Sequence, residues 1–527
     1  MIDVRDKVLV ALLVGCVLPL QSTAQSLAHP RDGEIHDADT RAWWHTTEAL
    51  SGDDMEGRDT GSPAYQRAAE YVAGRFKAAG LRPAGDSGGY FQPVPMHQIE
   101  VTPEGTSFAL LRPDGSETAL TFLQQVTLRP VGNLPAQMQA PLTFRGYCGK
   151  EAMGDIAGRF VVCFGTDRQG LPSGAERAAN ALQGRALGLI NIDDPYFTIE
   201  PPRWPAAYAR TVRLQAGEPV DNSPAAFATM RISAEAAVAL LAGSGQDPAA
   251  LLKRGGAKQA LPNFDIPVTL RVRLSVTQRD ISSPNVLAIL PGADAKLRGE
   301  YVVIAAHLDG YGFGTPVNGD GLYNGTLDDA AYVALLIQMA DDIKAHRLPP
   351  PKRSILFAAF TGEEKGLLGS YWFVAHPTVP VEALAADVNL DQLRPLFPLR
   401  ILTAEALGDT TLGDTARNVA APLHIDIRAD AEPERNLLHR ADQYPFLTIH
   451  VPAISFIFGY DPNTDAESRY REWYQHRYHR PQDDLSQPVD FQAAAQFDTF
   501  LYKLVETIAN APTRPMIYPT SPFAAKK

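Results

Sequence analysis

YVVIAAH at residues 301–307 and SILFAAF at residues 354–360 are two seven-residue runs that decide the fold. Between them, apolar residues from about Asp329 to Ala345 recur at helical spacing, and Pro349 to Pro351 forbid continuation of that helix. Further apolar runs follow in DVNLD (387–391) and PAISFIF (452–458). Such alternation predicts an α/β fold with a mixed, largely parallel central sheet flanked by helices.

The rest of the chain divides into several segments that differ in their apolar periodicity and in their Gly and Pro content. Residues 25–130 are predicted to be the N-terminal part of the main domain, with a helical pattern from Asp37 to about Gln98. Residues 131–272 contain short β-like runs such as RFVVCF (159–164), separated by Gly and Pro, and predict an inserted β-rich module. Residues 273–515 are predicted to form the rest of the main domain, and residues 516–527 a solvated tail.

Composition excludes several classes of protein. The chain has 527 residues, 45% of them apolar, which is enough to bury a core. It carries 48 Lys and Arg against 60 Asp and Glu, a net charge of −12, and has no basic run. A nucleic acid is therefore not expected as a partner.

The N-terminus reads as an export signal. VLVALLVGCVLPL (8–20) is too short to span a bilayer but suits the core of a signal peptide occupying residues 1–24, with cleavage after Ala24. We expect an exported protein, periplasmic or extracellular, without a membrane span. An alternative is acylation at Cys16, which would tether the chain to a membrane. Cys148 and Cys163 then remain, either as a disulfide or as two buried thiols.

Ionisable residues stand where the predicted strands end. His307 and Asp309 close the first run, Glu363 and Glu364 follow the second, and Asp391 ends the third. Tyr478 and His479 lie in the loop beyond the fourth run, and Asp328 opens the helix after the first. The carboxyl ends of parallel strands meet at one edge of a sheet, so we expect these side chains to share one pocket.

Two imidazoles and several carboxylates in one cleft predict a bound cation. They would repel and desolvate one another without one, and mixed nitrogen and oxygen ligation suits zinc, manganese or cobalt. One zinc takes about four ligands, whereas two ions sharing a carboxylate would use every candidate. The predicted sets are His307, Asp328 and Asp391 for one ion, and Asp328, Glu364 and His479 for the other.

These motifs resemble the metal-site motifs of the zinc aminopeptidases, family 28 of the metallopeptidases. In order they are HLD (307–309), NGTLDDAA (324–331), FTGEEKGLLGS (360–370), NLD (389–391) and YHRPQDD (478–484). RFVVCF and its surroundings are similar to the protease-associated module often inserted in these enzymes. The resemblance implies a zinc exopeptidase fold with a protease-associated insert, two zinc ions per chain, and peptides with a free N-terminus as substrates.

The resemblance also implies roles for single residues. Asp328 would bridge the ions, and Glu364 would be a terminal ligand. Glu363 would be the general base, free to take a proton from the attacking water and return it to the leaving amine. Asp309 would accept the second ring N–H of His307, and Tyr478 would hydrogen-bond the oxyanion.

Other hypotheses meet specific obstacles. GDSGG (85–89) copies the nucleophile motif of chymotrypsin-like proteases, but too little chain precedes Ser87 to supply their barrels, so we expect a surface turn. A carboxypeptidase of the same fold would need cations such as Arg435, Arg440 or Arg477 to bind the substrate carboxylate. A glutaminyl-cyclase-like acyltransferase would use one zinc, and a non-catalytic receptor-like ectodomain would lose ligands, whereas all five are present here.

Overall fold

The structure, a computed structural model, describes residues 29–165, 168–201, 203–215, 227–345, 350–391 and 394–525. The predicted signal peptide, residues 1–24, and its alternative of acylated Cys16 lie outside these residues. Among the described residues, no helix is both long and apolar enough to cross a lipid bilayer.

A ten-stranded mixed sheet forms the larger domain, with strand order β19-β18-β20-β17-β13-β16-β12-β2-β9 and β1 paired beside β12. Its parallel centre confirms the prediction from the apolar runs. The central strands are β13 (Tyr301–His307), β16 (Ser354–Phe360), β17 (Leu384–Leu390) and β20 (Ala453–Gly459). The flanking strands are β1 (Arg82–Pro83), β2 (Phe91–Val101), β9 (Ala209–Leu214), β12 (Val276–Leu290), β18 (Ile401–Glu405) and β19 (Asp426–Arg428).

Helices cover both faces of this sheet because its central strands are apolar on both sides. One face packs against five helices, and side chains such as Ile304 and Phe357 meet them there. These helices are α1 (Ala38–Ser51), α2 (Pro63–Ala78), α6 (Ala331–Lys344), α8 (Thr411–Ala420) and α11 (Phe491–Asn510). On the other face Val303 and Leu356 pack against α7 (Leu368–Ala375) and α9 (Gln443–Thr448).

The predicted helical pattern from Asp37 to about Gln98 is correct only as far as α2. Ser62 caps α2 by accepting the N–H of Tyr65, and Pro63 suits its first turn. Residues 91–101 instead form β2, antiparallel to β12. Pro93 and Pro95 exclude a helix there, while buried and more exposed side chains largely alternate along the strand.

A second, β-rich domain holds an eight-stranded sheet of order β4-β3-β11-β6-β7-β8-β10-β5. Its strands are β3 (Ser107–Leu111), β4 (Glu117–Leu120), β5 (Val126–Arg129), β6 (Gln137–Arg145), β7 (Phe160–Phe164), β8 (Gly188–Ile192), β10 (Ala228–Ile232) and β11 (Asn263–Arg273). Its helices are α3 (Gly174–Gln183), α4 (Ala234–Leu241) and α5 (Pro248–Gly256). The sequence predicted that the insert starts at residue 131, but the first strand of this sheet, β3, already starts at Ser107.

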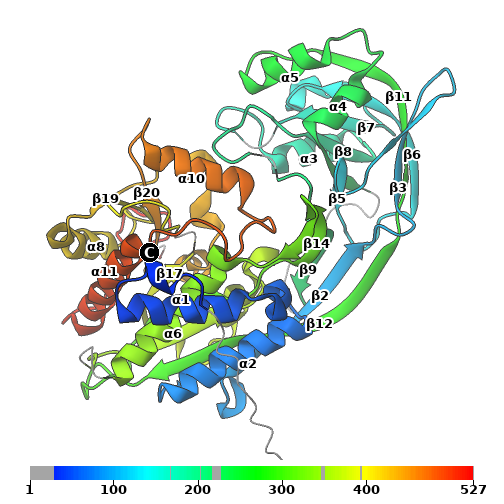
Figure 1. Ribbon diagram of the computed structural model, residues 1–527. Coiled ribbons are helices and arrows are strands. Elements are labelled where there is room, and N and C mark those ends of the chain that lie inside the picture. Colours follow the sequence, from blue (N-terminus) through cyan, green and yellow to red (C-terminus); the bar gives the residue numbers. More distant parts are fainter. Residues whose placement is uncertain are drawn as a thin grey trace, which may run out of the picture.

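Long paired strands connect the two domains. In Figure 1, β2 and β12 run side by side from the larger domain towards the β-rich domain at the upper right. Within the β-rich domain, Cys148 and Cys163 form a disulfide, which resolves the alternative that the sequence left open. The exposed turn Asp86–Gly88 carries Ser87, as expected for a surface turn.

Candidate metal centre

The carboxyl ends of the central strands bring the predicted ligands together. His307 is the last residue of β13, and Asp391 directly follows β17. Glu364 lies in the short helical turn Glu363–Lys365 after β16, and Asp328 lies in the turn Thr326–Ala330 that leads into α6. His479 follows α10 (Asp465–His476). The five side chains are buried or nearly so, although they span more than 170 positions in sequence.

The five side chains form two groups that share one carboxylate. Asp328 Oδ1 lies 3.3 Å from His307 Nε2, which is 3.9 Å from Asp391 Oδ1. Asp328 Oδ2 lies 3.1 Å from His479 Nε2, which is 3.2 Å from Glu364 Oε1. In each group the potential ligand atoms lie within 4.8 Å of one another. Each oxygen of Asp328 thus faces a different histidine, the arrangement expected of a bridging ligand.

The donor set fits zinc. Among the described residues, His307 Nε2, Asp328 Oδ2 and Glu364 Oε1 are buried and have no hydrogen-bond partner. Unpaired buried polar atoms are costly, and imidazole nitrogen with carboxylate oxygen is a common ligand set for zinc. The atoms that lack partners are those that face one another in the two groups. These side chains are therefore better placed to bind two cations than to form hydrogen bonds with one another.

Charge in the cluster supports the same conclusion. Burial raises the pKa of Asp391 to about 6, and burial with neighbouring carboxylates raises the pKa of Glu363 well above its ordinary value. Although burial opposes it, Arg394 and the two histidines hold the pKa of Asp328 well below its ordinary value. Added positive charge in the cluster would favour the ionised form of every carboxyl group in it.

The contact between Asp309 and the ring of His307 differs from the predicted one. The ring Nδ1 of His307 lies 3.0 Å from the backbone carbonyl of Asp309, whereas the carboxylate of Asp309 is 3.8 Å away. That carboxylate instead accepts the backbone N–H of Glu363 at 3.0 Å and the hydroxyl of Thr60 at 2.9 Å. In the turn after β13, the backbone carbonyl of Asp309, and not its carboxylate, lies next to the imidazole ring of His307. Asp309 consequently positions Glu363 as well as the loop after β13.

Glu363 stands beside the two groups. Its carboxylate oxygen Oε2 is 4.0 Å from His307 Nε2, and the residue is 9% exposed. It lines a cleft of about 400 Å³ together with Asp328, Glu364, Asp391 and His479. A carboxyl group with a raised pKa that opens to this cleft can accept and return a proton. His439 also lines the cleft but belongs to neither group of potential ligands.

Two buried residues that sequence reasoning missed hold the loops of the centre. Asp483 accepts the backbone N–H groups of Leu327 at 3.0 Å and Asp328 at 3.1 Å. Arg58 donates to the carbonyls of Leu308 at 2.9 Å and Gly325 at 2.8 Å. Asp483 lies inside YHRPQDD, which was quoted above, and Arg58 lies in EGRDTGS at residues 56–62. Since they bind backbone atoms, only their presence in those motifs could have indicated them.

The β-rich domain contributes to the cleft wall through the segment after β8. Arg203 Nη1 lies 2.5 Å from His479 Nδ1, and its guanidinium lies over the ring of Tyr478 at 4.6 Å. Glu200 accepts two hydrogen bonds from Arg440, at 2.6 Å and 3.0 Å. Arg440 also donates to the hydroxyl of Tyr478 at 3.4 Å. The cleft is thus bounded by both domains, and two guanidinium groups lie at its wall.

The chain is similar in sequence to known metallopeptidases. Residues 285–505 match the sequence model of "Peptidase family M28". A "Probable zinc metalloprotease" of Pyrenophora tritici-repentis is 27% identical over 45% of this chain and 59% of its own length. One of Pyrenophora teres f. teres is also 27% identical, over 45% of this chain and 50% of its own length. The chain therefore spans about half the length of the curated relatives that it matches.

Solved structures show the same fold. An aminopeptidase from Aneurinibacillus sp. strain AM-1 has a TM-score of 0.59 at 18% identity, covering 92% of this chain and 96% of that one. BSAP, a zinc aminopeptidase from Bacillus subtilis, has a TM-score of 0.56 at 18% identity, covering 89% and 95%. A peptidase M28 precursor from Shewanella amazonensis SB2B has a TM-score of 0.55 at 18% identity, covering 92% and 99%.

Proposed function

We propose, from the premise that residues 285–505 form a domain of peptidase family M28, that the protein is a zinc-dependent aminopeptidase that holds two zinc ions. The observation that carries the proposal is the division of Asp328 between two groups of buried donors. His307 and Asp391 complete one group, and Glu364 and His479 complete the other. Zinc held there would supply a Lewis acid that lowers the pKa of water towards about 7 and polarises the scissile carbonyl.

Glu363 is the proton carrier in this proposal. Its neighbour Glu364 is committed to a metal group, whereas Glu363 has its own place at the cleft. The carboxylate of Asp309 fixes the backbone of Glu363 through the N–H hydrogen bond. Glu363 takes a proton from the attacking water and passes it to the amine that leaves. A positioned general base of this kind contributes roughly 10² to 10⁴ in rate.

Tyr478 is proposed to donate a hydrogen bond to the oxyanion. It lines the cleft, follows α10 and precedes His479, so its backbone is fixed beside the metal group. The guanidinium groups of Arg203 and Arg440 lie against it. Cations beside a phenol favour negative charge near its hydroxyl, which suits the carbonyl oxygen as the peptide bond is attacked.

The wall of the cleft supports exopeptidase action. Glu200 and Arg203 of the β-rich domain contact Arg440 and Tyr478 and so bound one side of the cleft beside the proposed metal centre. A cleft bounded on one side suits the terminal residue of a peptide. Arg203 and Arg440 favour one rival, a carboxypeptidase of the same fold, because guanidinium groups bind carboxylates. Glu200 neutralises part of that charge, which is why we prefer the aminopeptidase.

Substrates blocked at one end separate these functions. Aminoacyl anilides with a free α-amine should be hydrolysed by the zinc-loaded protein, and the same anilides with an N-acetyl group should not. Peptides amidated at the C-terminus should remain substrates. Hydrolysis of the acetylated compounds together with failure on C-terminal amides would contradict the aminopeptidase and support the carboxypeptidase.

We further propose that the protein is exported. The proposal is supported by the apolar run at residues 8–20 and by the disulfide between Cys148 and Cys163, since such bonds persist in oxidising compartments. Sequencing of the purified exported protein should begin at Gln25. A lipid-modified N-terminus at Cys16 would indicate a tethered form, and a chain retained in the cytosol with Met1 intact would contradict export.

A further inference from the structure

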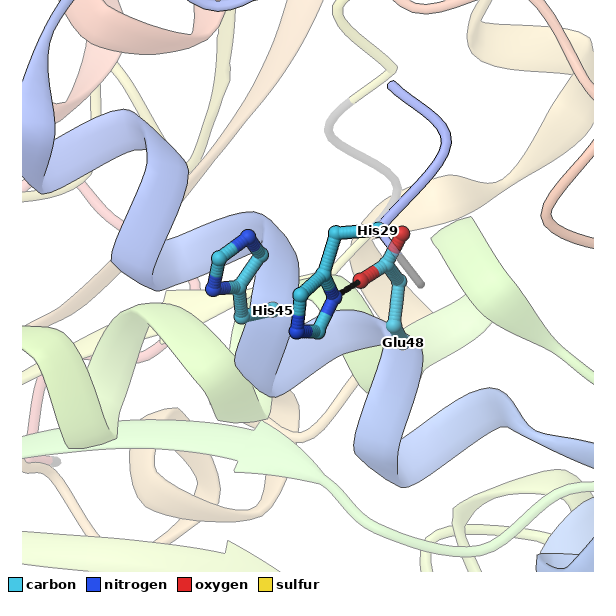
Figure 2. A group of neighbouring side chains, drawn as sticks. All are labelled: His29, His45 and Glu48. Atoms are coloured by element: carbon cyan, nitrogen blue, oxygen red, sulfur yellow. Dashed lines mark hydrogen bonds and ion pairs between the residues drawn. The ribbon is translucent and has the colours of Figure 1, made fainter. Parts of the chain in front are cut away.

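A third group of potential metal ligands lies on the outer side of α1, apart from the catalytic cleft. It consists of His29, His45 and Glu48, and we call it the N-terminal cluster. His45 and Glu48 are three positions apart on α1 and so project from the same side of the helix. His29 comes from the segment that precedes the helix. Figure 2 shows its ring between the ring of His45 and the carboxylate of Glu48.

The N-terminal cluster places two imidazoles and a carboxylate in direct contact. One nitrogen from each histidine and one oxygen of Glu48 all lie within 4.8 Å of one another. His29 Nδ1 pairs with Glu48 Oε2. The two rings lie face to face, with centroids 3.5 Å apart and planes inclined by 15°. The cluster therefore gathers two imidazole rings and one carboxylate at one place, and these are groups that commonly ligate zinc.

Asp32 prepares His45 to bind through its other nitrogen. Asp32 Oδ1 lies 2.6 Å from His45 Nε2. A carboxylate accepts, so Nε2 carries the proton and the lone pair of a neutral His45 is on Nδ1. A carboxylate behind the second ring nitrogen is the usual support of a histidine that ligates a metal.

We propose that the N-terminal cluster is a further site for zinc or a similar transition-metal ion, ligated by His29, His45 and Glu48. Two imidazoles and one carboxylate are a known zinc ligand set that leaves a position for water. The side chains of His29 and His45 are 27% and 31% exposed, so an ion and its water can reach them from solution. Binding turns the rings out of their stack, because both lone pairs must point at one ion.

The proposed ion would fasten the segment before α1 to the body of the domain. Arg31 of this segment lies over the rings of Trp44 and Phe491 and donates to the carbonyl of Gln487 at 3.0 Å. The side-chain amide of Gln487 in turn donates to Asp483, the residue that holds the backbone of Asp328. The N-terminal cluster therefore anchors a segment that contacts the support of the catalytic loop.

The proposal is tested by counting zinc at fixed free zinc concentrations. The whole protein and its variants are equilibrated in zinc buffers that span the nanomolar to micromolar range, separated from unbound zinc and analysed for metal per chain. The variants are His45→Phe, which keeps an aromatic ring against His29, His29→Phe and Glu48→Gln. His36→Phe is the matched control, because His36 is exposed and lies outside the cluster.

The wild type and His36→Phe should bind about one zinc per chain more than each of the other three variants. All four variants should keep the wild-type rate of peptide hydrolysis at saturating zinc, which also shows that they fold. Equal zinc content in all five proteins over the whole range would overturn the proposal and leave two plain histidine–carboxylate pairs. The difference does not depend on how many ions the catalytic cleft holds, so it fails independently of the proposed function.

Discussion

Both sheets bury acidic residues at the carboxyl ends of parallel strands, but they balance that charge differently. In the β-rich domain, Asp193 and Asp194 follow β8 and are each 1% exposed. Arg231 donates to Asp193 at 2.8 Å, and Arg168 lies 3.2 Å from Asp194. In the larger domain Asp328, Glu364 and Asp391 face histidine nitrogens at 3.1 to 3.9 Å.

This difference shows which buried acids are able to bind a metal ion. A carboxylate that faces only arginine has little to offer a cation from solution, whereas carboxylates that face imidazole nitrogens attract one. Asp328 belongs to the second kind, because it lies between two histidines although Arg394 is also 3.3 Å from it. The same placement at a strand end therefore serves structure in the β-rich domain and, as we propose, ligation in the larger domain. The partner of each acid, and not its place in the fold, decides which of the two it does.

The most direct way to break this comparison is the same substitution at both strand ends. Asp391→Asn should lower the zinc content by about one equivalent and reduce peptide hydrolysis to background, because it removes a ligand. Asp193→Asn should leave zinc and hydrolysis unchanged and cost about 1–3 kcal/mol of stability, since Arg231 loses a charged partner. Metal analysis and denaturant unfolding measure both. Loss of zinc from Asp193→Asn would show that the two strand ends do not differ as we argue.

Glu363→Gln should lower kcat by at least about a hundredfold while the zinc content stays at the wild-type value. The amide keeps the shape of the side chain but cannot accept the proton. Steady-state kinetics on a free-amine anilide, with metal analysis of the same sample, measures both quantities. An unchanged kcat would remove Glu363 from its proposed role, and a loss of zinc would make it a ligand.

Asp483→Asn should weaken zinc binding by roughly 10- to 100-fold, the usual cost of losing a group that supports a ligand. The carboxylate of Asp483 accepts two backbone N–H groups beside Asp328, and an amide can accept only through its single oxygen. Asp484→Asn is the control, because Asp484 bonds only locally to Ser486 among the contacts described for its side chain. Equal zinc affinities for the two variants would contradict the supporting role of Asp483.

Asp498 of α11 is a third kind of buried acid, in which a bound proton, and not an arginine or a metal ion, neutralises the charge. Burial and the neighbouring Asp342 raise its pKa to about 8. An unfolded aspartate titrates near about pH 4, so between about pH 4 and 8 the folded protein binds a proton that the unfolded chain releases. This contribution makes the free energy of unfolding fall as pH rises.

Asp498→Asn removes that dependence. The stability of the variant relative to the wild type should therefore increase from about pH 5 to about pH 8, on the order of a few kcal/mol. Denaturant unfolding at several pH values measures the difference. A constant difference over this range would mean that Asp498 is ionised in the folded protein at about pH 5.

The sequence predicts the centre of the larger sheet well because its strands are apolar on both faces and therefore appear as continuous runs. It also places His307, Glu364 and Asp391 together, since residues directly after parallel strands share an edge. The sequence did not predict strand β2, because this segment comes soon after helix α2 in the chain. Its partner strand β12 lies about 180 residues away in the sequence, so no local pattern indicates the pairing. The contacts of Asp483 and Arg203 depend on how distant loops meet, which no local pattern records.

The central claim is that the shared carboxylate of Asp328 lies between two divalent cations. Anomalous diffraction at the zinc absorption edge, from crystals of zinc-loaded protein, tests it most directly. We predict two anomalous peaks, one beside His307 and Asp391 and one beside Glu364 and His479, with an oxygen of Asp328 next to each. A single peak, or none, at Asp328 would contradict the account.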